Sequence, residues 1–401
     1  MEYQHLHIFK QELTNELSSI LNWWATNAPD DINGGFYGKI DNNNQVTGDA
    51  PKGSVLNARI LWTFSAAYNH QPGSLYRQMA DRAYKYIIDN FIDKSFGGVY
   101  WSVDYEGQPL DTKKQVYAMA FTIYGLSEYY RASKNDEARQ TAIELFNLLA
   151  EKAYDPVKTG YFEAFTQDWQ PVDDLRLSAK DANEKKTMNT HLHVLEGFTN
   201  LYRIWPDGLL RKHISILLNN FFDYFINKET HHLNLFFDEH WNSKGGLISY
   251  GHDIEATWLL LEAAEVIEYS EAIEKIKRLI PIMAQATTAA LDDDGGLWYE
   301  YEPQDHHLVK EKHWWVQAEA MVGFFNSWQV TGDTKYLNIA LKSWGFIKNG
   351  IIDKHNGEWF WGIGETGRIM KDEDKAGFWK CPYHNSRACL ELIRRIDHGK
   401  L

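Results

Sequence analysis

A short phrase in which glycine is followed by aromatic residues recurs along this 401-residue chain at a nearly constant interval. Its copies begin at or next to residues 35, 98, 160, 296 and 357, so the steps between them are 63, 62, 136 and 61 residues. The long step equals two units and contains LNLFFDEHW (233–241), a copy without glycines. A fixed interval of this length indicates a repeat architecture, here with six units. The other five copies read GGFYG (34–38), GGVYW (97–101), GYFEAF (160–165), GGLWYEYE (295–302) and GEWFWG (357–362).

Each copy lies between two segments with the periodicity of a helix. The segment before it ends in an apolar residue followed by aspartate, as at Ile92-Asp93. The segment after it is typified by RILWTFSAAY from Arg59 and WWVQAEAMVGFFNSW from Trp314. Apolar residues in these segments recur every three or four positions, which predicts amphipathic helices. The glycine–aromatic phrases between them are expected to be loops or short hairpins.

Two helices per unit make twelve helices in six helical hairpins. A hairpin cannot bury both of its faces alone, so neighbouring units must cover one another. We therefore predict an all-α fold, an (α/α)6 barrel whose inside is lined by the second helix of each unit, built by residues 1–401 as a single domain. An open helical solenoid is the alternative. Solenoid units are usually shorter, about 34 to 47 residues, and here the aromatic phrase persists into the last unit.

Charge and composition exclude several classes of partner. The chain has 41 Lys and Arg against 55 Asp and Glu, a net charge of −14 that repels nucleic acid and anionic lipid. No apolar run approaches the roughly 18 residues of a membrane span, and the N-terminal segment lacks the apolar core of a signal peptide. Cys381 and Cys389 do not have the spacing of a disulfide scaffold or a structural zinc site. We expect a cytoplasmic protein that is a monomer, with no membrane or nucleic-acid partner.

The residues near the start of each predicted inner helix should meet around one central pit. All of them are polar or aromatic. Because positions three or four apart share a helix face, Asn189 should point with His193, His252 with Glu255, and Trp315 with Glu319. In chain order the ring is Arg59, Tyr117, Asn189, His193, His252, Glu255, Trp315, Glu319, Trp379 and His384.

Three members of this ring, His193, His252 and His384, are candidate acid–base groups, because imidazole is the only side chain with an unperturbed pKa near neutrality. Pro382 suits the first position of a helix, which predicts that His384 lies in the first turn. There the helix dipole disfavours imidazolium and keeps the ring a proton acceptor. His252 has a similar position, and Glu255 one turn on could hold its tautomer.

A metal held by these three imidazoles is the alternative use of the ring. No HExxH motif occurs, and the pairs His231-His232 and His306-His307 lie in polar, loop-like surroundings typical of solvated side chains. His191 should face nearly away from His193, which favours a structural role for it. We therefore predict no metal and assign the imidazoles to proton transfer.

The remaining ring members favour a sugar ligand. Trp315 and Trp379 offer flat apolar faces that match the C–H face of a pyranose, while Arg59, Asn189 and Glu255 can bond its hydroxyls. Moving a proton at the carbon next to an aldehyde needs two near-neutral bases on opposite sides, and imidazoles suit that reaction.

Two other classes of function remain open on the residues alone. An (α/α)6 glycoside hydrolase would flank a glycosidic bond with acidic residues such as Asp181 or Glu319. A non-catalytic sugar-binding or protein-binding barrel would use the aromatic side chains, with the histidines incidental.

Several segments resemble the cellobiose 2-epimerases, within the N-acylglucosamine 2-epimerase superfamily. GGFYG, RILWTFSAAY and GGVYW are similar to the N-terminal half of that family, so the resemblance covers nearly the whole chain. The signature segments are KTMNTHLHVLEGFTNLYR (186–203), SYGHDIEATWLL (249–260), HWWVQAEAMVGFFN (313–326) and WKCPYHNSRAC (379–389).

The resemblance implies an (α/α)6 barrel that interconverts glucose and mannose at C2 of the reducing-end sugar of β-1,4-linked disaccharides such as cellobiose and lactose, without a metal or nucleotide cofactor. It implies that His252 and His384 exchange the C2 proton on opposite faces, through ring opening and a cis-enediolate, and that His193 assists. Related epimerases act on free mannose and glucose, and that activity is the alternative within the superfamily. The residues that the resemblance assigns to sugar binding are Arg59, Tyr117, Asn189, Trp315 and Trp379.

Overall fold

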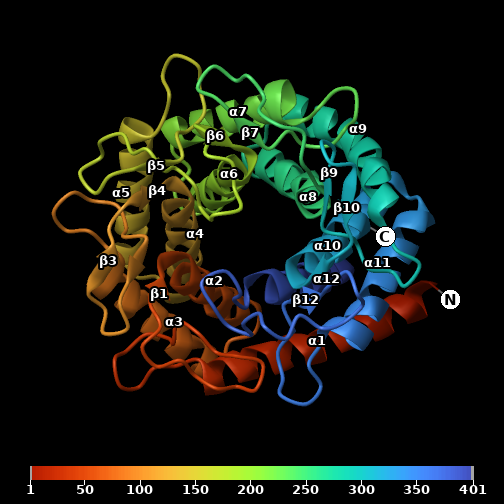
Figure 1. The fold of residues 1–401 in the computed structure, drawn as a ribbon, viewed down its shortest axis with the longest axis horizontal. Coiled ribbons are helices and arrows are strands. Elements are labelled where there is room, and N and C mark those ends of the chain that lie inside the picture. Colours follow the sequence, from red (N-terminus) through yellow and green to blue (C-terminus); the bar gives the residue numbers. More distant parts are fainter. Residues whose placement is uncertain (1, 399–401) are drawn as a thin grey trace.

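Among residues 2–398, twelve α-helices alternate between an inner and an outer ring around one centre (Figure 1). The computed structural model describes residues 2–398. The second helix of each predicted unit lies inside, so the expected (α/α)6 barrel of six helical hairpins is confirmed. The inner helices are α2 (Ser54–His70), α4 (Val116–Ser133), α6 (Met188–Tyr202), α8 (Tyr250–Val266), α10 (Trp314–Thr331) and α12 (Tyr383–His398).

The outer helices cover the inner ring from outside. Three of them, α3, α7 and α11, run on into a π-helical turn before the chain reverses. Their bounds are α1 (Glu2–Asn27), α3 (Ser74–Tyr86), α5 (Asp136–Lys152), α7 (Gly208–Asn220), α9 (Ser270–Thr287) and α11 (Thr334–Phe346).

The inner helices are buried on nearly every side. In α2 every residue from Ser54 to Ser65 is buried, and in α4 every residue from Val116 to Tyr129. Outer helices cover one side of each, inner neighbours cover the flanks, and side chains fill the middle. The expected amphipathic pattern is therefore wrong for α2 and α4, because a helix inside a closed barrel has no face toward solvent over these residues.

Contacts between first and last units close the ring. Each inner helix packs against the next, and α12 packs against both α2 and α1. The indole of Trp24 in α1 donates to Glu358 Oε2 at 2.7 Å, and the indole of Trp344 in α11 donates to Glu12 Oε2 at 2.6 Å. These contacts join residues more than 300 positions apart, which an open solenoid would not do.

Inner helices approach closely where one of them carries glycine. A Cβ on Gly197 of α6 would lie 2.5 Å from the carbonyl oxygen of Ala120 in α4. A Cβ on Gly323 of α10 would lie equally close, 2.5 Å, to the carbonyl oxygen of Ile254 in α8. Only glycine allows the two backbones to pass at this distance.

The glycine–aromatic phrases form the same loop six times. In each unit one backbone bridge joins the residue that ends the outer-helix segment to the residue that begins the aromatic part. The bridge of the unit without glycines, Ile226↔Leu233, confirms that it is the missing copy. The other five are Pro29↔Phe36, Ile92↔Val99, Tyr154↔Tyr161, Leu291↔Leu297 and Ile352↔Trp359.

A carboxylate holds five of these loops, and a lysine neutralises each one; we call these five contacts the frame pairs. In the second unit Asp93 accepts hydrogen bonds from the backbone N–H groups of Ser95 and Phe96 and binds buried Lys114 at 2.6 Å. The fourth unit has Asn227 at the aspartate position. The frame pairs are Lys52–Asp30, Lys114–Asp93, Lys186–Asp155, Lys312–Asp292 and Lys375–Asp353.

Short antiparallel strands gather where the inner helices begin. Five strands lead directly into α2, α4, α6, α8 and α10, and each pairs with a strand of the following hairpin, as in Lys114↔Phe165 and Ile248↔Tyr301. The sheets have the orders β1-β2-β3, β4-β5, β6-β7, β10-β9-β8 and β11-β12. The strands are β1 (Lys52–Gly53), β2 (Ser102–Val103), β3 (Pro109–Asp111), β4 (Lys114–Gln115), β5 (Ala164–Phe165), β6 (Lys186–Thr187), β7 (Phe236–Phe237), β8 (Ile248–Ser249), β9 (Glu300–Glu302), β10 (His307–Val309), β11 (Lys312–His313) and β12 (Gly362–Ile363).

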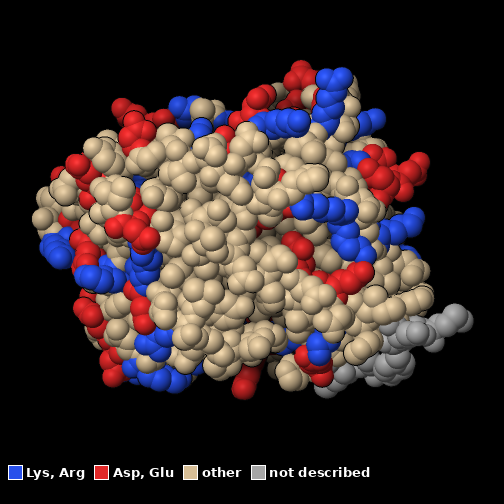
Figure 2. Space-filling model, turned by 90° about the horizontal axis from the view of Figure 1, so that it is seen from below, with Lys and Arg blue, Asp and Glu red and all other residues tan. Residues whose placement is uncertain are grey.

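Charged side chains of both signs are spread over the surface, and both cysteines lie in the interior. Figure 2 shows a face on which acidic and basic side chains are mixed around a largely uncharged middle, without a continuous basic area. Among residues 2–398, no helix combines the length and apolarity that crossing a membrane requires. Cys381 and Cys389 are both buried and free, so neither is in a disulfide.

Candidate active site

A cavity of about 490 Å³ opens among the N-terminal ends of the inner helices. Its volume lies within the roughly 300–1,000 Å³ usual for small-molecule sites. Glu319 is the one member of the predicted ring that does not reach the cavity wall. The structure brings together at this wall Arg59, Tyr117, Asn189, His193, His252, Glu255, Trp315, Trp379 and His384.

These side chains occupy fixed positions in the six units. We count positions from a residue just before each inner helix, the entrance residue, which is position zero. His252 and His384 then both hold position four, while position three is held by Tyr117, Asn189, Trp315 and Tyr383. The seventh position is about one helical turn deeper. The entrance residues are Lys52, Lys114, Lys186, Ile248, Lys312 and Lys380, and the seventh residues are Arg59, Phe121, His193, Glu255, Glu319 and Arg387.

Trp315 lies between His252 and His384. Its ring centroid is 4.7 Å from that of His252 in α8 and 5.7 Å from that of His384 in α12. Both imidazoles lie in the first turn of their helices, as predicted, and Pro382 lies one residue before the first residue of α12. The two rings therefore reach the cavity from different helices, with the α10 indole between them.

The Nδ1 atoms of these two rings contact different partners. His384 Nδ1 donates to Glu319 Oε1 at 2.7 Å, so the carboxylate predicted to point with Trp315 supports His384. His252 Nδ1 lies 2.8 Å from Ser249 Oγ. The expectation that Glu255 holds the tautomer of His252 is wrong, because an arginine from α12 takes that carboxylate instead.

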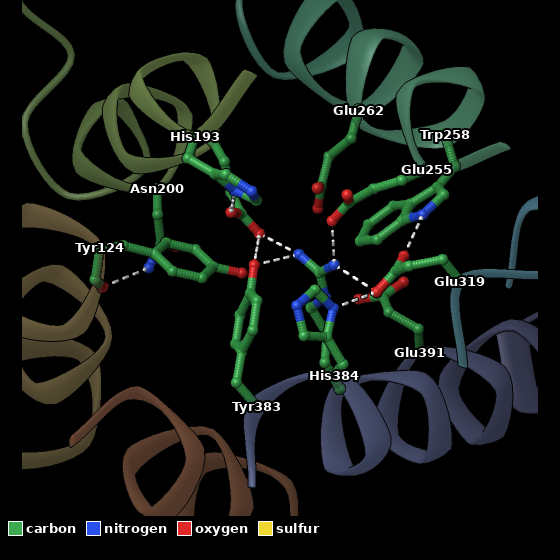
Figure 3. A network of polar contacts seen from close by, with 12 residues as sticks. Tyr124, His193, Asn200, Glu255, Trp258, Glu262, Glu319, Tyr383, His384 and Glu391 are labelled. Carbon is green, nitrogen blue, oxygen red and sulfur yellow. Dashed lines mark hydrogen bonds and ion pairs between the residues drawn. The ribbon is translucent and has the colours of Figure 1, made fainter. Parts of the chain in front are cut away.

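That arginine is Arg387, which joins three carboxylates (Figure 3). Its Nη2 lies 2.6 Å from both Glu255 Oε1 and Glu319 Oε1, and its Nη1 binds Glu196 Oε1 and the Tyr383 hydroxyl. Three carboxyls thus share one guanidinium in a region closed to water. Sequence reasoning missed Arg387, although it holds the same seventh position as Arg59 and His193.

His193 and His191 point in different directions, as predicted. His193 Nδ1 donates to Glu196 Oε2 at 2.9 Å, and its ring lies on the cavity wall. His191 is completely buried, donates through Nδ1 to the Thr187 carbonyl and accepts the Tyr161 N–H at Nε2. Those two bonds tie α6 to the third glycine–aromatic loop. The partner Glu196 was also missed, although it follows His193 by three residues on the same helix.

Burial keeps the three cavity imidazoles neutral. It lowers the pKa of His252 to about 3, with a smaller contribution from His193. Burial, with Arg59 and Arg387 next in effect, lowers the pKa of His384 well below its usual value, and burial also lowers that of His193. Neutral rings can accept protons, which agrees with the expectation, although burial rather than the helix dipole is the main cause.

The carboxyl groups of Glu196 and Glu255 differ in pKa. Arg387 and the His193 hydrogen bond outweigh burial and lower the pKa of Glu196 to about 2. Burial, reinforced by the charge of Glu319, raises the pKa of Glu255 well above its usual value. Glu255 Oε2 is buried without a hydrogen-bond partner among the described residues, on the cavity wall. A protonated Glu255 could therefore donate to a ligand oxygen.

Arg59 and two aromatic residues form the opposite wall. Arg59 Nη2 donates to the Tyr117 hydroxyl at 2.8 Å, and the Tyr117 ring meets Trp379 edge to face at 6.0 Å between centroids. Trp379 and Trp315 are both half-buried, so one face of each indole is open to a ligand. Asn189 Oδ1 has no partner among residues 2–398 and is available to a hydroxyl group.

Glu255, Glu319 and His384 are the three described residues close enough to hold a metal ion, with ligand atoms within 4.8 Å of one another. Arg387 Nη2 already binds both of these carboxylates, and His384 Nδ1 donates to one of them. A guanidinium therefore occupies the position that suits a cation. The set differs from the three imidazoles considered as metal ligands on the sequence.

The acids proposed for a hydrolase are far less suited to that role. Asp181 lies in the loop between β5 and β6, where its Oδ2 accepts from the N–H and hydroxyl of Ser178 at 2.8 and 2.9 Å. Glu319 is behind His384, off the cavity wall. The loop itself forms one side of the cavity, and Gln115 Nε2 fixes it by donating to the Arg176 carbonyl.

The histidine pairs outside the cavity differ from each other. His306 and His307 are exposed, as expected of solvated side chains. His232 is not: its side chain is 14% exposed and its Nδ1 lies 2.6 Å from buried Asp253 Oδ2. In the unit without a frame pair, this contact joins the loop to α8.

Comparisons with known proteins agree on one family. Residues 35–388 match the N-acylglucosamine 2-epimerase (GlcNAc 2-epimerase) family. The cellobiose 2-epimerase of Bacteroides fragilis is 49% identical over 387 residues, which cover 96% of this chain and 99% of that protein. The cellobiose 2-epimerase of Dictyoglomus turgidum is 38% identical over 394 residues, 98% of this chain and 100% of that protein. The structure of cellobiose 2-epimerase from Bacillus thermoamylovorans B4167 superposes with a TM-score of 0.92 at 40% identity, covering 97% of this chain and 100% of that one.

Proposed function

This chain belongs to the N-acylglucosamine 2-epimerase family and is an isomerase, and on that basis we propose that it interconverts glucose and mannose at C2 of the reducing-end sugar of β-1,4-linked disaccharides such as cellobiose and lactose. The observation that carries the proposal is the pair of neutral imidazoles, half-buried His252 and buried His384, on either side of Trp315 in one cavity. Relatives at 49% and 38% identity that are cellobiose 2-epimerases support the choice of disaccharide.

The reaction begins when the reducing-end ring opens to the aldehyde. One of His252 and His384 then accepts the C2 proton at the nitrogen facing the cavity. The C–H electrons move into the C1–C2 bond, and the aldehyde oxygen takes the negative charge of a cis-enediolate. The other imidazole, after taking up a proton from solvent, protonates C2 from the opposite side to give the epimer, and the first imidazole releases its proton to solvent. Two positioned acid–base groups suit this chemistry, because each must act as base in one direction and as acid in the other.

The other cavity groups bind the sugar and its charge. Arg59, which Tyr117 orients, can bind the enediolate oxygen, and His193, with Glu196 behind it, can assist proton transfer during ring opening. Asn189 and the protonated Glu255 can bond sugar hydroxyls, while Trp315 and Trp379 stack on the pyranose faces. No step requires a metal or nucleotide cofactor.

The test is an incubation with cellobiose, followed by chromatography of the disaccharides and monosaccharides. We expect a disaccharide with mannose at its reducing end and no free glucose. Free glucose would indicate a hydrolase. Turnover of free mannose with no reaction of cellobiose would assign the chain to the monosaccharide epimerases.

The same incubation in D₂O tests the mechanism. We expect deuterium at C2 of the epimer, as seen by NMR, apart from any fraction that one imidazole transfers directly. A product that stays fully protonated at C2 over many turnovers would contradict proton exchange with two bases.

A further inference from the structure

His252 differs from the other two cavity imidazoles in the chemical group that contacts its Nδ1 atom. Carboxylates accept from Nδ1 of His193 and Nδ1 of His384, at 2.9 and 2.7 Å. Nδ1 of His252 has the hydroxyl of Ser249 at 2.8 Å as its partner among the described residues. The two candidate bases are therefore held by groups of different chemistry.

Ser249 uses its hydroxyl unusually for its place in the fold. It is the N-cap residue of α8, where serine normally accepts a hydrogen bond from the first turn of the helix, but its side chain makes no such bond. Thr187, the N-cap of α6, does cap its helix by accepting from the Thr190 N–H at 3.2 Å. Ser249 is 1% exposed, and the pairing of β8 with β9 fixes its backbone. Its hydroxyl is directed to His252 instead of the helix.

Hydroxyl and carboxylate partners constrain an imidazole differently. A carboxylate oxygen that already accepts from a guanidinium, as Glu319 Oε1 does from Arg387 Nη2 at 2.6 Å, accepts from the imidazole as well, so it fixes the proton of a neutral ring on Nδ1 and leaves Nε2 as the acceptor. A hydroxyl can accept from Nδ1 or donate to it, so either tautomer of the neutral ring is satisfied. A carboxylate also favours the charged ring more than a hydroxyl does.

We propose that Ser249 is a positioning residue for His252, and that its hydroxyl orients the ring while allowing it either tautomer, whereas Glu319 holds His384 in the Nδ1–H form. The two neutral rings then differ: neutral His384 presents a lone pair to the cavity, whereas neutral His252 can present a lone pair or an N–H. The kinetic part of this inference rests on the proposed function, but the tautomer part does not.

The first test is ¹⁵N NMR of the full-length protein labelled at histidine, with signals assigned from His252→Gln and His384→Gln. We expect the His384 shifts of the Nδ1–H tautomer and, for His252, shifts between those of the two tautomers. Ser249→Ala should move the His252 signals and leave those of His384 in place. A wild-type His252 with the same single tautomer as His384, or signals unchanged in Ser249→Ala, would overturn the proposal. These outcomes hold whatever sugar the protein acts on.

The second test is steady-state kinetics with cellobiose. Ser249→Ala should lower kcat roughly tenfold, the loss expected from one orienting hydrogen bond, with KM unchanged. Ser249→Thr, which keeps the hydroxyl, should recover most of kcat. Ser327→Ala is the matched control, because it removes a buried hydroxyl that bonds the Gly323 carbonyl in α10, away from the cavity.

Two kinetic results would contradict the positioning role. A higher KM with unchanged kcat in Ser249→Ala would mean that the hydroxyl binds the sugar directly. A wild-type kcat and KM would mean that His252 does not need the hydroxyl. If cellobiose is not a substrate at all, the proposed function fails, and the NMR result still decides the tautomer question.

Discussion

The frame pairs and the cavity network are both built from charged side chains, but they are organised in opposite ways. In four units a frame pair matches one buried lysine with one aspartate, and in the fifth unit Lys312 binds both Asp292 and Asp294. In the cavity network Arg387 faces Glu196, Glu255 and Glu319, and no two units contribute the same set of side chains. Where charge is balanced the sequence repeats, and where it is unbalanced the sequence varies.

The difference separates the residues that maintain the fold from those that carry chemistry. A matched pair fixes a loop and keeps both groups ionised. An unmatched cluster of acids beside neutral imidazoles shifts pKa values, and such shifts are typical of functional sites. Repetition in this barrel therefore marks structure, and departure from the repeat marks the site.

The strongest test of this division is removal of the cavity imidazoles. His252→Ala and His384→Ala should each lower kcat/KM for the epimerisation about 10²- to 10⁴-fold, because each removes one positioned acid–base group. The thermal unfolding curve should stay close to that of the wild type. Near-wild-type rates in both variants would move the chemistry to other residues, and a large loss of stability would assign the rings to the frame.

Breaking a frame pair should have the reverse effect. Lys114→Ala leaves the Asp93 carboxylate buried without its cation and should lower the free energy of unfolding by about 3–5 kcal/mol, with little change in activity per folded molecule. Lys85→Ala, which removes a pair whose lysine is 77% exposed, should cost at most about 1 kcal/mol. Urea unfolding of the two variants makes the comparison, and equal losses would refute the structural role of the frame pairs.

A smaller effect, a dependence of stability on pH, should distinguish His191 from the cavity imidazole of His193 two residues away. Burial lowers the pKa of His191 to about 3, below the value near 6.5 of the unfolded chain. Between these values the unfolded chain binds a proton that the folded chain does not, so this group lowers stability by about 1.4 kcal/mol for each pH unit below 6.5.

His191→Gln removes that dependence together with the two ring hydrogen bonds. It should be less stable than the wild type at pH 7.5, and the gap in unfolding free energy should narrow by about 2 kcal/mol at pH 5. Urea unfolding at several pH values measures the gap. A gap that stays constant would show that His191 is not held neutral by the fold.

The smallest expected effect is that of a chelator. Arg387 occupies the position between Glu255 and Glu319 that suits a cation, so exhaustive EDTA treatment should leave the epimerisation rate unchanged. A loss of rate that one divalent ion restores would contradict this and would bring the carboxylates of the cavity network into the chemistry.

The sequence predicted the barrel because its evidence is periodic. The glycine–aromatic interval gave six units, and helical spacing gave the inner and outer segments, so even the unit without glycines could be found. The same spacing brought His252, His384 and their neighbours to one end of the barrel. These inferences need only the positions of residues along helices, which local sequence specifies.

The sequence did not predict which side chains form hydrogen bonds and ion pairs with one another. Glu255 lies one turn from His252 on α8, but Arg387 of α12 binds it, a contact that exists only because the ring closes. Ser249 is three residues from His252 and was not considered. The seventh-position rule would have identified Arg387, but that rule counts from the entrance residue just before each inner helix. In the last unit this residue is Lys380, which binds Glu358 and belongs to no frame pair, so the glycine–aromatic phrases do not mark it.

Closure of the ring by α1 and α12 also determines when the enzyme becomes competent during its synthesis. Helix α12 carries His384 and Arg387 and emerges from the ribosome after the eleven other helices. Until it docks against α1 and α2, Glu196, Glu255 and Glu319 have no shared cation, and one of the two proposed bases is missing. With His384 as one of the two proposed bases, a nascent chain therefore lacks a complete pair of bases until α12 docks against α1 and α2.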